Sequence, residues 1–148
     1  MLRNVDPVIS AELLYVLMQM GHGDDLVLCD VNHPAVTIAK ATTYGKLIDL
    51  PGCDIPRATQ AVLSLMPLDT FVDEPVMRIR VVGDPDGVVP IFGAMQNAVD
   101  ACEKRHITIG AYDRFEFYEA AKKSFAIVRT SDPGPYGCFI LRKGVITL

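Results

Sequence analysis

Apolar and polar positions along the chain follow two different periods. Four segments carry apolar residues at helical spacing, namely residues 10–20, 54–65, 90–104 and 115–123. Short apolar or alternating runs, which are typical of strands, occupy residues 26–29, 46–50, 76–82, 107–109, 125–129 and 138–142. Helices interleaved with strands in this order indicate an α/β fold with a central sheet and helices packed on it. We expect one layered domain over residues 1–148.

The residues at the ends of these segments predict where the helices begin and end. Ser10 and Asp54 are of the types that cap helix N-termini with a side-chain oxygen. Gly21 predicts the end of the first helix. Residues 31–35 predict a loop that enters a short helix. The buried stripe of the second long helix is expected to comprise Ala58, Ala61, Val62 and Leu65.

Composition and charge limit the classes of partner. The formal net charge of -4, without a dense Lys/Arg patch, argues against nucleic acid or an anionic membrane and favours a small neutral ligand. The chain has no signal-peptide pattern and no apolar run near the roughly 20 residues that cross a bilayer. The cysteines lack metal-type spacing, which favours free thiols in a reducing compartment. We therefore expect a cytoplasmic protein.

The stretch from Met20 to Asp30 holds two candidate site residues. His22 lies between two glycines in a predicted turn, where an imidazole can give and take a proton at neutral pH. Asp30 follows a short buried strand, at the end where ligands of α/β sheets usually bind. The strand between them separates the two side chains, so they need not touch each other. The alternatives are a surface-turn histidine and an ordinary capping aspartate.

Two further segments carry candidate binding residues. Arg114 lies near a predicted helix start, where a cation gains little from the helix dipole, so a ligand or an ion-pair role is favoured. Phe115 and the aromatic residues after it are expected to be core. Tyr136 and Gly137 enter the last strand, and a phenol and flexible backbone amides there can bind a ligand. Cys138 has no nearby base in sequence, which favours packing over a nucleophilic role.

An alternative interpretation is a metal site built from His22, Asp30 and His33. Two histidines and a carboxylate can bind zinc or iron, but their spacing matches no compact ligand motif. We therefore expect no metal.

Several ordered blocks of the sequence together resemble the ribose pyranase and fucose mutarotase (RbsD/FucU) family, most closely its fucose mutarotase branch. The blocks are Ser10–Leu14, Met20–Asp24 with Asp30, Leu65–Asp69, Arg114–Glu119 followed by Ala121–Ala126, and Tyr136–Gly137 before Leu141–Gly144. The resemblance implies an isomerase without a cofactor that interconverts the anomers of a free monosaccharide. It also implies a ring-shaped homo-oligomer, a decamer in the family, with sites between subunits.

By the same resemblance His22 matches the catalytic proton donor, while Asp30, Arg114, Tyr136 and Gly137 match sugar-binding positions. Cys138 stands at a further binding position where the family usually has an asparagine, and residues 46–52 also depart from the fucose branch. We expect L-fucose as the first substrate and D-ribose as the second. The base that removes the anomeric proton stays open between water, Asp30 and Tyr136. A non-catalytic sugar-binding protein is the main alternative, and a metal-dependent hydrolase is a weaker one.

Overall fold

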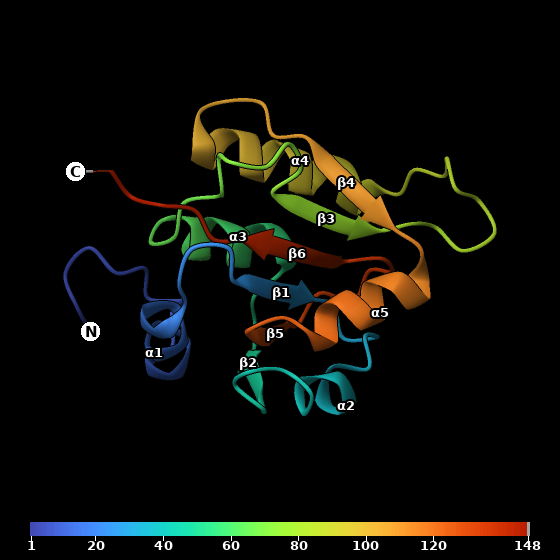
Figure 1. Cartoon of the computed structure of the whole chain (residues 1–148). Helices are drawn as coiled ribbons and strands as arrows, with labels where there is room; N and C mark the ends of the chain where they lie inside the picture. Colours follow the sequence, from blue (N-terminus) through green and yellow to red (C-terminus); the bar gives the residue numbers. More distant parts are fainter. Residues whose placement is uncertain (148) are drawn as a thin grey trace.

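A computed structural model describes residues 1–147 and forms one six-stranded sheet with helices on both faces (Figure 1). The strands in spatial order are β2 (Leu47–Leu50), β5 (Ala126–Thr130), β1 (Asp25–Cys29), β6 (Cys138–Arg142), β3 (Val76–Ile79) and β4 (Ile109–Tyr112). This arrangement confirms the predicted α/β class.

Five helices cover the sheet. On one face the apolar sides of α1 (Ala11–Gln19), α3 (Ile55–Leu63) and α4 (Pro90–Glu103) form a core with buried residues such as Leu26, Leu28 and Phe139. On the other face α2 (Ala35–Ala39) and α5 (Arg114–Lys122) cover a second, smaller cluster around Val27, Ile127 and Phe117. The alternation of side chains along each strand therefore supplies both cores.

The strand directions define two different edges of the sheet. All strands except β6 run parallel, and β6 lies antiparallel between β1 and β3. In Figure 1 the arrows of β1 and β3 point to one side and the arrow of β6 points to the other. The carboxyl ends of the parallel strands thus lie at the edge where β6 begins. Loops at this edge come from distant parts of the sequence.

Most predicted helix starts are confirmed. The Ser10 hydroxyl accepts a hydrogen bond from the Leu13 amide, and the Asp54 carboxylate accepts one from the Arg57 amide. Gly21 follows the extended C-cap residue Met20, so the first helix ends at Gln19, one residue earlier than predicted. None of the helices within residues 1–147 is long and apolar enough to cross a membrane.

Three details of the sequence prediction are wrong. The strand predicted over residues 76–82 ends at Ile79, because the chain turns through Gly83 at a positive φ of 77°. Leu65 lies beyond the end of α3 and is only half-buried, since Ser64 is already the C-cap residue. The strand predicted at residues 107–109 lies at 109–112 instead, in register with β3.

Candidate functional site

A pocket of about 270 Å³ opens at the carboxyl edge of the parallel strands. Asp30 enters it directly after β1, Ile79 ends β3, and Arg114 begins α5 after β4. The segment that leads into β6 contributes Tyr136 and Cys138. The remaining lining residues are Asn32, His33, Val82, Tyr118 and Pro135. The structure therefore brings together four of the predicted binding residues, as the rule for α/β sheets suggests.

Asp30 is 2% exposed, and backbone amides surround its carboxylate. Oδ1 accepts hydrogen bonds from the amides of Asn32 (2.7 Å) and His33 (3.1 Å), and Oδ2 accepts one from the amide of Gly137 (2.9 Å). Burial raises the pKa of Asp30 above its usual value, while these amide hydrogen bonds oppose that shift. Asp30 thus ties the loop after β1 to the loop before β6.

Gly137 is buried and allows this close approach. A Cβ atom built at this position would lie 3.2 Å from Cβ of Asp30 and 3.3 Å from Cγ1 of Ile55, which is tighter than ordinary packing. The neighbouring residue Tyr136 adopts a left-handed backbone conformation with φ of 64°. That conformation is uncommon outside glycine, and such residues gather at functional sites.

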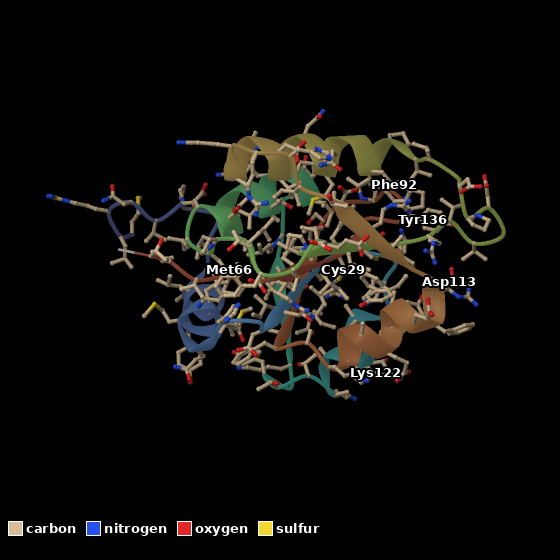
Figure 2. The ribbon with its side chains drawn as sticks, turned by 45° about the horizontal axis from the view of Figure 1, so that its top comes forward. Cys29, Met66, Phe92, Asp113, Lys122 and Tyr136 are labelled. Atoms are coloured by element: carbon tan, nitrogen blue, oxygen red, sulfur yellow. The ribbon has the colours of Figure 1, made fainter. Side chains whose placement is uncertain are left out.

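The hydroxyl group of Tyr136 is oriented by the loop that follows β3. The amide of Val82 donates a hydrogen bond to the phenolic oxygen at 3.2 Å. Figure 2 shows Tyr136 beside this loop, at the same end of the molecule as Asp113 at the start of α5. Because the oxygen already accepts from the protein, its own hydrogen remains available to donate to a ligand.

Arg114 is exposed at the N-terminus of α5. Its guanidinium stacks on the ring of Phe115 at 4.5 Å, and within residues 1–147 it forms no ion pair. Tyr118 lies one helical turn further along α5 and also lines the pocket. The expected burial of Phe115 is wrong, since this side chain is 68% exposed at the mouth of a neighbouring cavity. An unpaired guanidinium is a suitable donor for ligand hydroxyl groups.

Cys138 and His33 form the buried floor of the pocket. The Cys138 Sγ atom lies 3.7 Å from Asp30 Oδ2 and 3.6 Å from His33 Nδ1. Burial and the charge of Asp30 raise the pKa of the thiol, so it stays protonated. Burial lowers the pKa of His33 to about 4, so its ring is neutral at physiological pH. The thiol is therefore a hydrogen-bonding group here and not a nucleophile.

His22 does not line this pocket. It lies in the turn before β1, whereas Asp30 follows the other end of the same strand. Its Nε2 lies 3.1 Å from Oδ1 of Asp69, and its ring packs edge-on against Phe71. The Asp69 carboxylate also accepts a hydrogen bond from the Phe71 amide. This hydrogen bond and, to a smaller extent, the one with His22 lower the pKa of Asp69. A buried carboxylate that holds one imidazole nitrogen fixes the tautomer and leaves Nδ1 for proton transfer.

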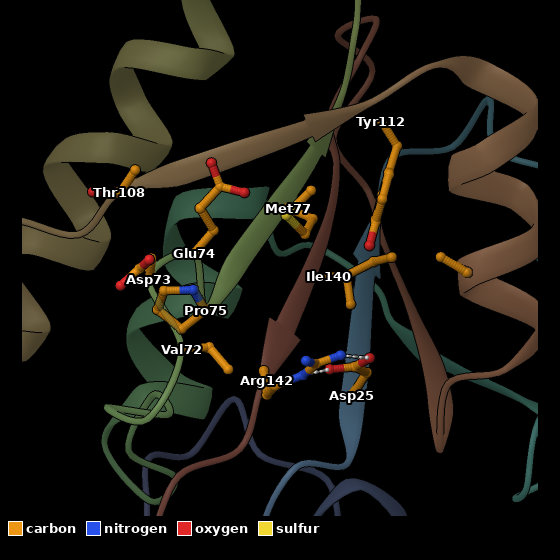
Figure 3. A pocket seen from close by; sticks show the side chains of 11 residues that line it. Asp25, Val72, Asp73, Glu74, Pro75, Met77, Thr108, Tyr112, Ile140 and Arg142 are labelled. Atoms are coloured by element: carbon orange, nitrogen blue, oxygen red, sulfur yellow. Dashed lines mark hydrogen bonds and ion pairs between the residues drawn. The ribbon is translucent and has the colours of Figure 1, made fainter.

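A larger cavity of about 500 Å³ lies over β3, β6 and the start of β1 (Figure 3). Of its charged lining groups, Arg142 donates two hydrogen bonds to the Asp25 carboxylate at 2.9 and 3.0 Å, while Asp73 and Glu74 line the opposite side (Figure 3). Met77 and Tyr112 form much of its floor. This cavity brings together none of the predicted binding residues. The smaller pocket around Asp30 is thus the candidate site.

The residues that the structure describes contain no group of three His, Cys, Asp or Glu side chains placed to hold a metal ion. His22 and His33 lie in different surroundings, one beside Asp69 and one beside Cys138. A metal site built from His22, Asp30 and His33 therefore has no geometric support in residues 1–147.

Sequence reasoning missed several residues of the pocket, among them His33 and Tyr118, and one partner of His22. His33 was considered only as a metal ligand, and Tyr118 was assigned to the core. The position of Tyr118 four residues after Arg114, on the same side of a helix, was the available signal. Asp69, which pairs with His22 across 47 positions of sequence, gave no local signal at all.

Comparison with known proteins places these features in one family. Residues 3–146 match the RbsD / FucU transport protein family, and the chain belongs to it. The human fucose mutarotase is 40% identical over 152 residues, which cover 99% of this chain and 96% of that protein. The L-fucose mutarotase of Haemophilus influenzae is 32% identical over 149 residues, which cover 98% of this chain and 97% of that protein.

Solved structures agree with the sequence relatives. The fucose mutarotase of Streptococcus pneumoniae in complex with L-fucose superimposes with a TM-score of 0.88 at 38% identity, covering 99% of this chain and all of that one. The RbsD of Bacillus subtilis has a TM-score of 0.75 at 19% identity, over 99% of this chain and 100% of that chain, which shows a shared fold.

Proposed function

We propose that this protein is a sugar mutarotase that interconverts the α and β anomers of a free monosaccharide, with L-fucose as the first substrate. The observation that carries the proposal is the convergence of Asp30, Arg114 and Tyr136 on one pocket at the carboxyl edge of the sheet. The identity of 32–40% with fucose mutarotases over nearly the whole chain supports the same reaction.

The reaction needs proton transfer and no change of oxidation state. The ring oxygen accepts a proton while the anomeric hydroxyl loses one, the ring opens to an aldehyde, and the terminal carbon rotates before closure on the other face. His22 is the proposed proton donor: in its protonated form Nε2–H donates to Asp69, and Nδ1–H is left to give its proton to the ring oxygen of the sugar. Arg114 and the Tyr136 hydroxyl hold sugar hydroxyl groups. A single positioned acid or base contributes typically 10²–10⁴-fold to such a step.

With His22 as the proposed donor, its position supports a site that is completed by a second copy of the chain. His22 and the pocket lie at opposite edges of one sheet, so the imidazole of one subunit meets the sugar held by another. Exposed apolar side chains border both halves, with Phe71 beside His22, and Val82 and Phe115 around the pocket. Such side chains are typical of surfaces that are covered in an assembly. We propose a ring-shaped homo-oligomer, a decamer as the family resemblance implies.

The proposed location is the cytoplasm. Four free thiols, at Cys29, Cys53, Cys102 and Cys138, fit a reducing compartment.

The test is the rate of anomer exchange measured by saturation-difference NMR on L-fucose, D-ribose and D-galactose with the purified protein. We expect faster exchange than in buffer, and fastest for L-fucose. Exchange no faster than in buffer for every sugar would contradict the proposal. Sugar binding without any acceleration would favour a non-catalytic sugar-binding protein, which Cys138 in the place of the family asparagine would explain.

A further inference from the structure

The hydrogen-bond capacity of Asp30 is nearly exhausted by the protein itself. A carboxylate offers about four lone-pair sites. Three of them accept hydrogen bonds from the backbone amides of Asn32, His33 and Gly137. The fourth, on Oδ2, faces the Cys138 thiol at 3.7 Å. If the thiol hydrogen occupies this site, no acceptor is left for a sugar hydroxyl group.

The Cys138 thiol has a second acceptor at nearly the same distance. His33 Nδ1 lies 3.6 Å from the sulfur, against 3.7 Å for Asp30 Oδ2. A thiol carries one hydrogen, which rotates about the Cβ–Sγ bond and can point to only one of the two. The direction of this hydrogen therefore decides whether Asp30 is saturated or free to accept.

The surroundings of His33 suit the role of acceptor. The side chain is buried with 7% exposure, and its ring packs edge-on against Phe117 and Tyr118. Its Nε2 is the one buried side-chain nitrogen or oxygen of residues 1–147 that has no hydrogen-bond partner. Buried polar groups are usually paired, so an unpaired one needs an explanation. When Nδ1 accepts the thiol hydrogen, the neutral ring carries its own hydrogen on Nε2, so the tautomer that serves Cys138 is the one that leaves Nε2 unpaired.

We propose that His33 is a positioning residue of the sugar site. Its Nδ1 accepts the Cys138 hydrogen when a sugar hydroxyl group takes the place of that hydrogen on Asp30 Oδ2. The hydrogen bond from Cys138 to Asp30 is replaced by one from the sugar hydroxyl group, and the thiol then donates to His33 instead. No covalent bond changes. The inference rests on the proposed function, because it assigns how that same pocket admits its substrate.

A pair of substitutions separates the two ring nitrogens. The side-chain amide of H33N lies near the position of Nδ1, whereas that of H33Q lies near the position of Nε2. We expect H33Q to raise the KM for L-fucose about tenfold, since one hydrogen bond to a charged group is lost, and to change kcat by less than about twofold. H33N should keep KM within about twofold of the wild-type value. Equal losses in both variants would overturn the proposal.

A double-mutant comparison tests whether His33 acts through the thiol. In the C138A background there is no thiol hydrogen to accept, so adding H33Q should change KM by less than about twofold from the C138A value. A merely structural role for His33 predicts the same tenfold loss in both backgrounds, and that result would overturn the proposal.

A spectroscopic readout keeps this inference separate from the proposed function. The infrared S–H stretching band of Cys138, assigned by its loss in C138A, should shift when L-fucose is added to wild type and stay unchanged in H33Q. A shift without anomer exchange would support the inference and contradict the mutarotase function. Anomer exchange without a shift of the S–H band would support the mutarotase function and contradict the inference. Failure of L-fucose, D-ribose and D-galactose all to bind would overturn both.

Discussion

His22 and Asp30 lie at the two ends of strand β1, with five strand residues between their loops. At about 3.3 Å per residue the strand alone spans roughly 16 Å, which is longer than a monosaccharide ring. One chain therefore cannot bring both side chains to one sugar. This separation is why the proposed site combines the imidazole of one subunit with the binding pocket of another.

Replacement of His22 by alanine should remove most of the catalysis. We expect the exchange rate for L-fucose to fall by about 10²–10⁴-fold, with little change in stability because the side chain is exposed at the surface of the single chain. Saturation-difference NMR measures the rate, and thermal unfolding checks the fold. His106→Ala is the matched control, since His106 is also exposed and also pairs with a carboxylate, that of Asp100. Full activity of H22A would remove His22 from the mechanism.

Gly137 should tolerate no side chain. In G137A the added Cβ meets Asp30 and Ile55 at 3.2–3.3 Å, so we expect a loss of about 1–3 kcal/mol in unfolding free energy and weaker sugar binding. G93A is the matched control, because nothing lies within 4 Å of its new Cβ and the helix interior gains about 0.5–1 kcal/mol from alanine. Denaturant unfolding of both variants measures the difference. Equal stabilities would show that the close approach at Gly137 is unimportant.

Acid should destabilise the fold through His33. Its folded pKa of about 4 lies below the ordinary value of 6.5, so between these values the unfolded chain binds a proton that the native ring does not. The contribution of His33 to the free energy of unfolding is complete above pH 6.5 and decreases by about 3 kcal/mol as the pH falls to 4. Asp30, which with Cys138 and Tyr118 faces His33, has a raised pKa and opposes this trend.

The H33Q variant separates the effect of His33 on the pH dependence of stability from the effect of Asp30. Unfolding free energies of wild type and H33Q, measured by denaturant titration between pH 7 and pH 4, should show a steeper loss in wild type. Parallel curves for the two proteins would mean that His33 titrates normally in the folded state.

Much of the fold could be predicted from local sequence. Ser10 and Asp54 act as helix caps because one side-chain oxygen and an amide three residues away suffice. The order of the strands in the sheet could not be read this way, since it depends on pairings between distant segments. The loop after β3 illustrates the limit, because its Val82 amide donates a hydrogen bond to Tyr136, 54 positions away.

The candidate site divides in the same way. Asp30, Arg114 and Tyr136 could be predicted because each follows or precedes a strand at the edge where α/β proteins bind ligands. The roles of His33 and Asp69 could not, because each depends on contact with a residue far along the chain, Cys138 and His22 respectively. Strand length indicated that His22 and Asp30 need not touch each other, whereas the absence of His22 from the pocket could be seen only in the structure.

The most direct measurement is anomer exchange by a mixture of H22A, which lacks the proposed donor, and R114A, which lacks a proposed sugar-binding group, co-assembled by unfolding and refolding together. We expect each variant alone to be inactive. If the imidazole of one copy acts on sugar held by another, sites that combine an intact His22 with an intact Arg114 re-form, and random assembly restores roughly a quarter of the wild-type rate. A mixture of H22A with the double variant H22A/R114A serves as the control and should stay inactive. No recovery in the co-assembled H22A and R114A mixture would contradict a site shared between copies of this chain.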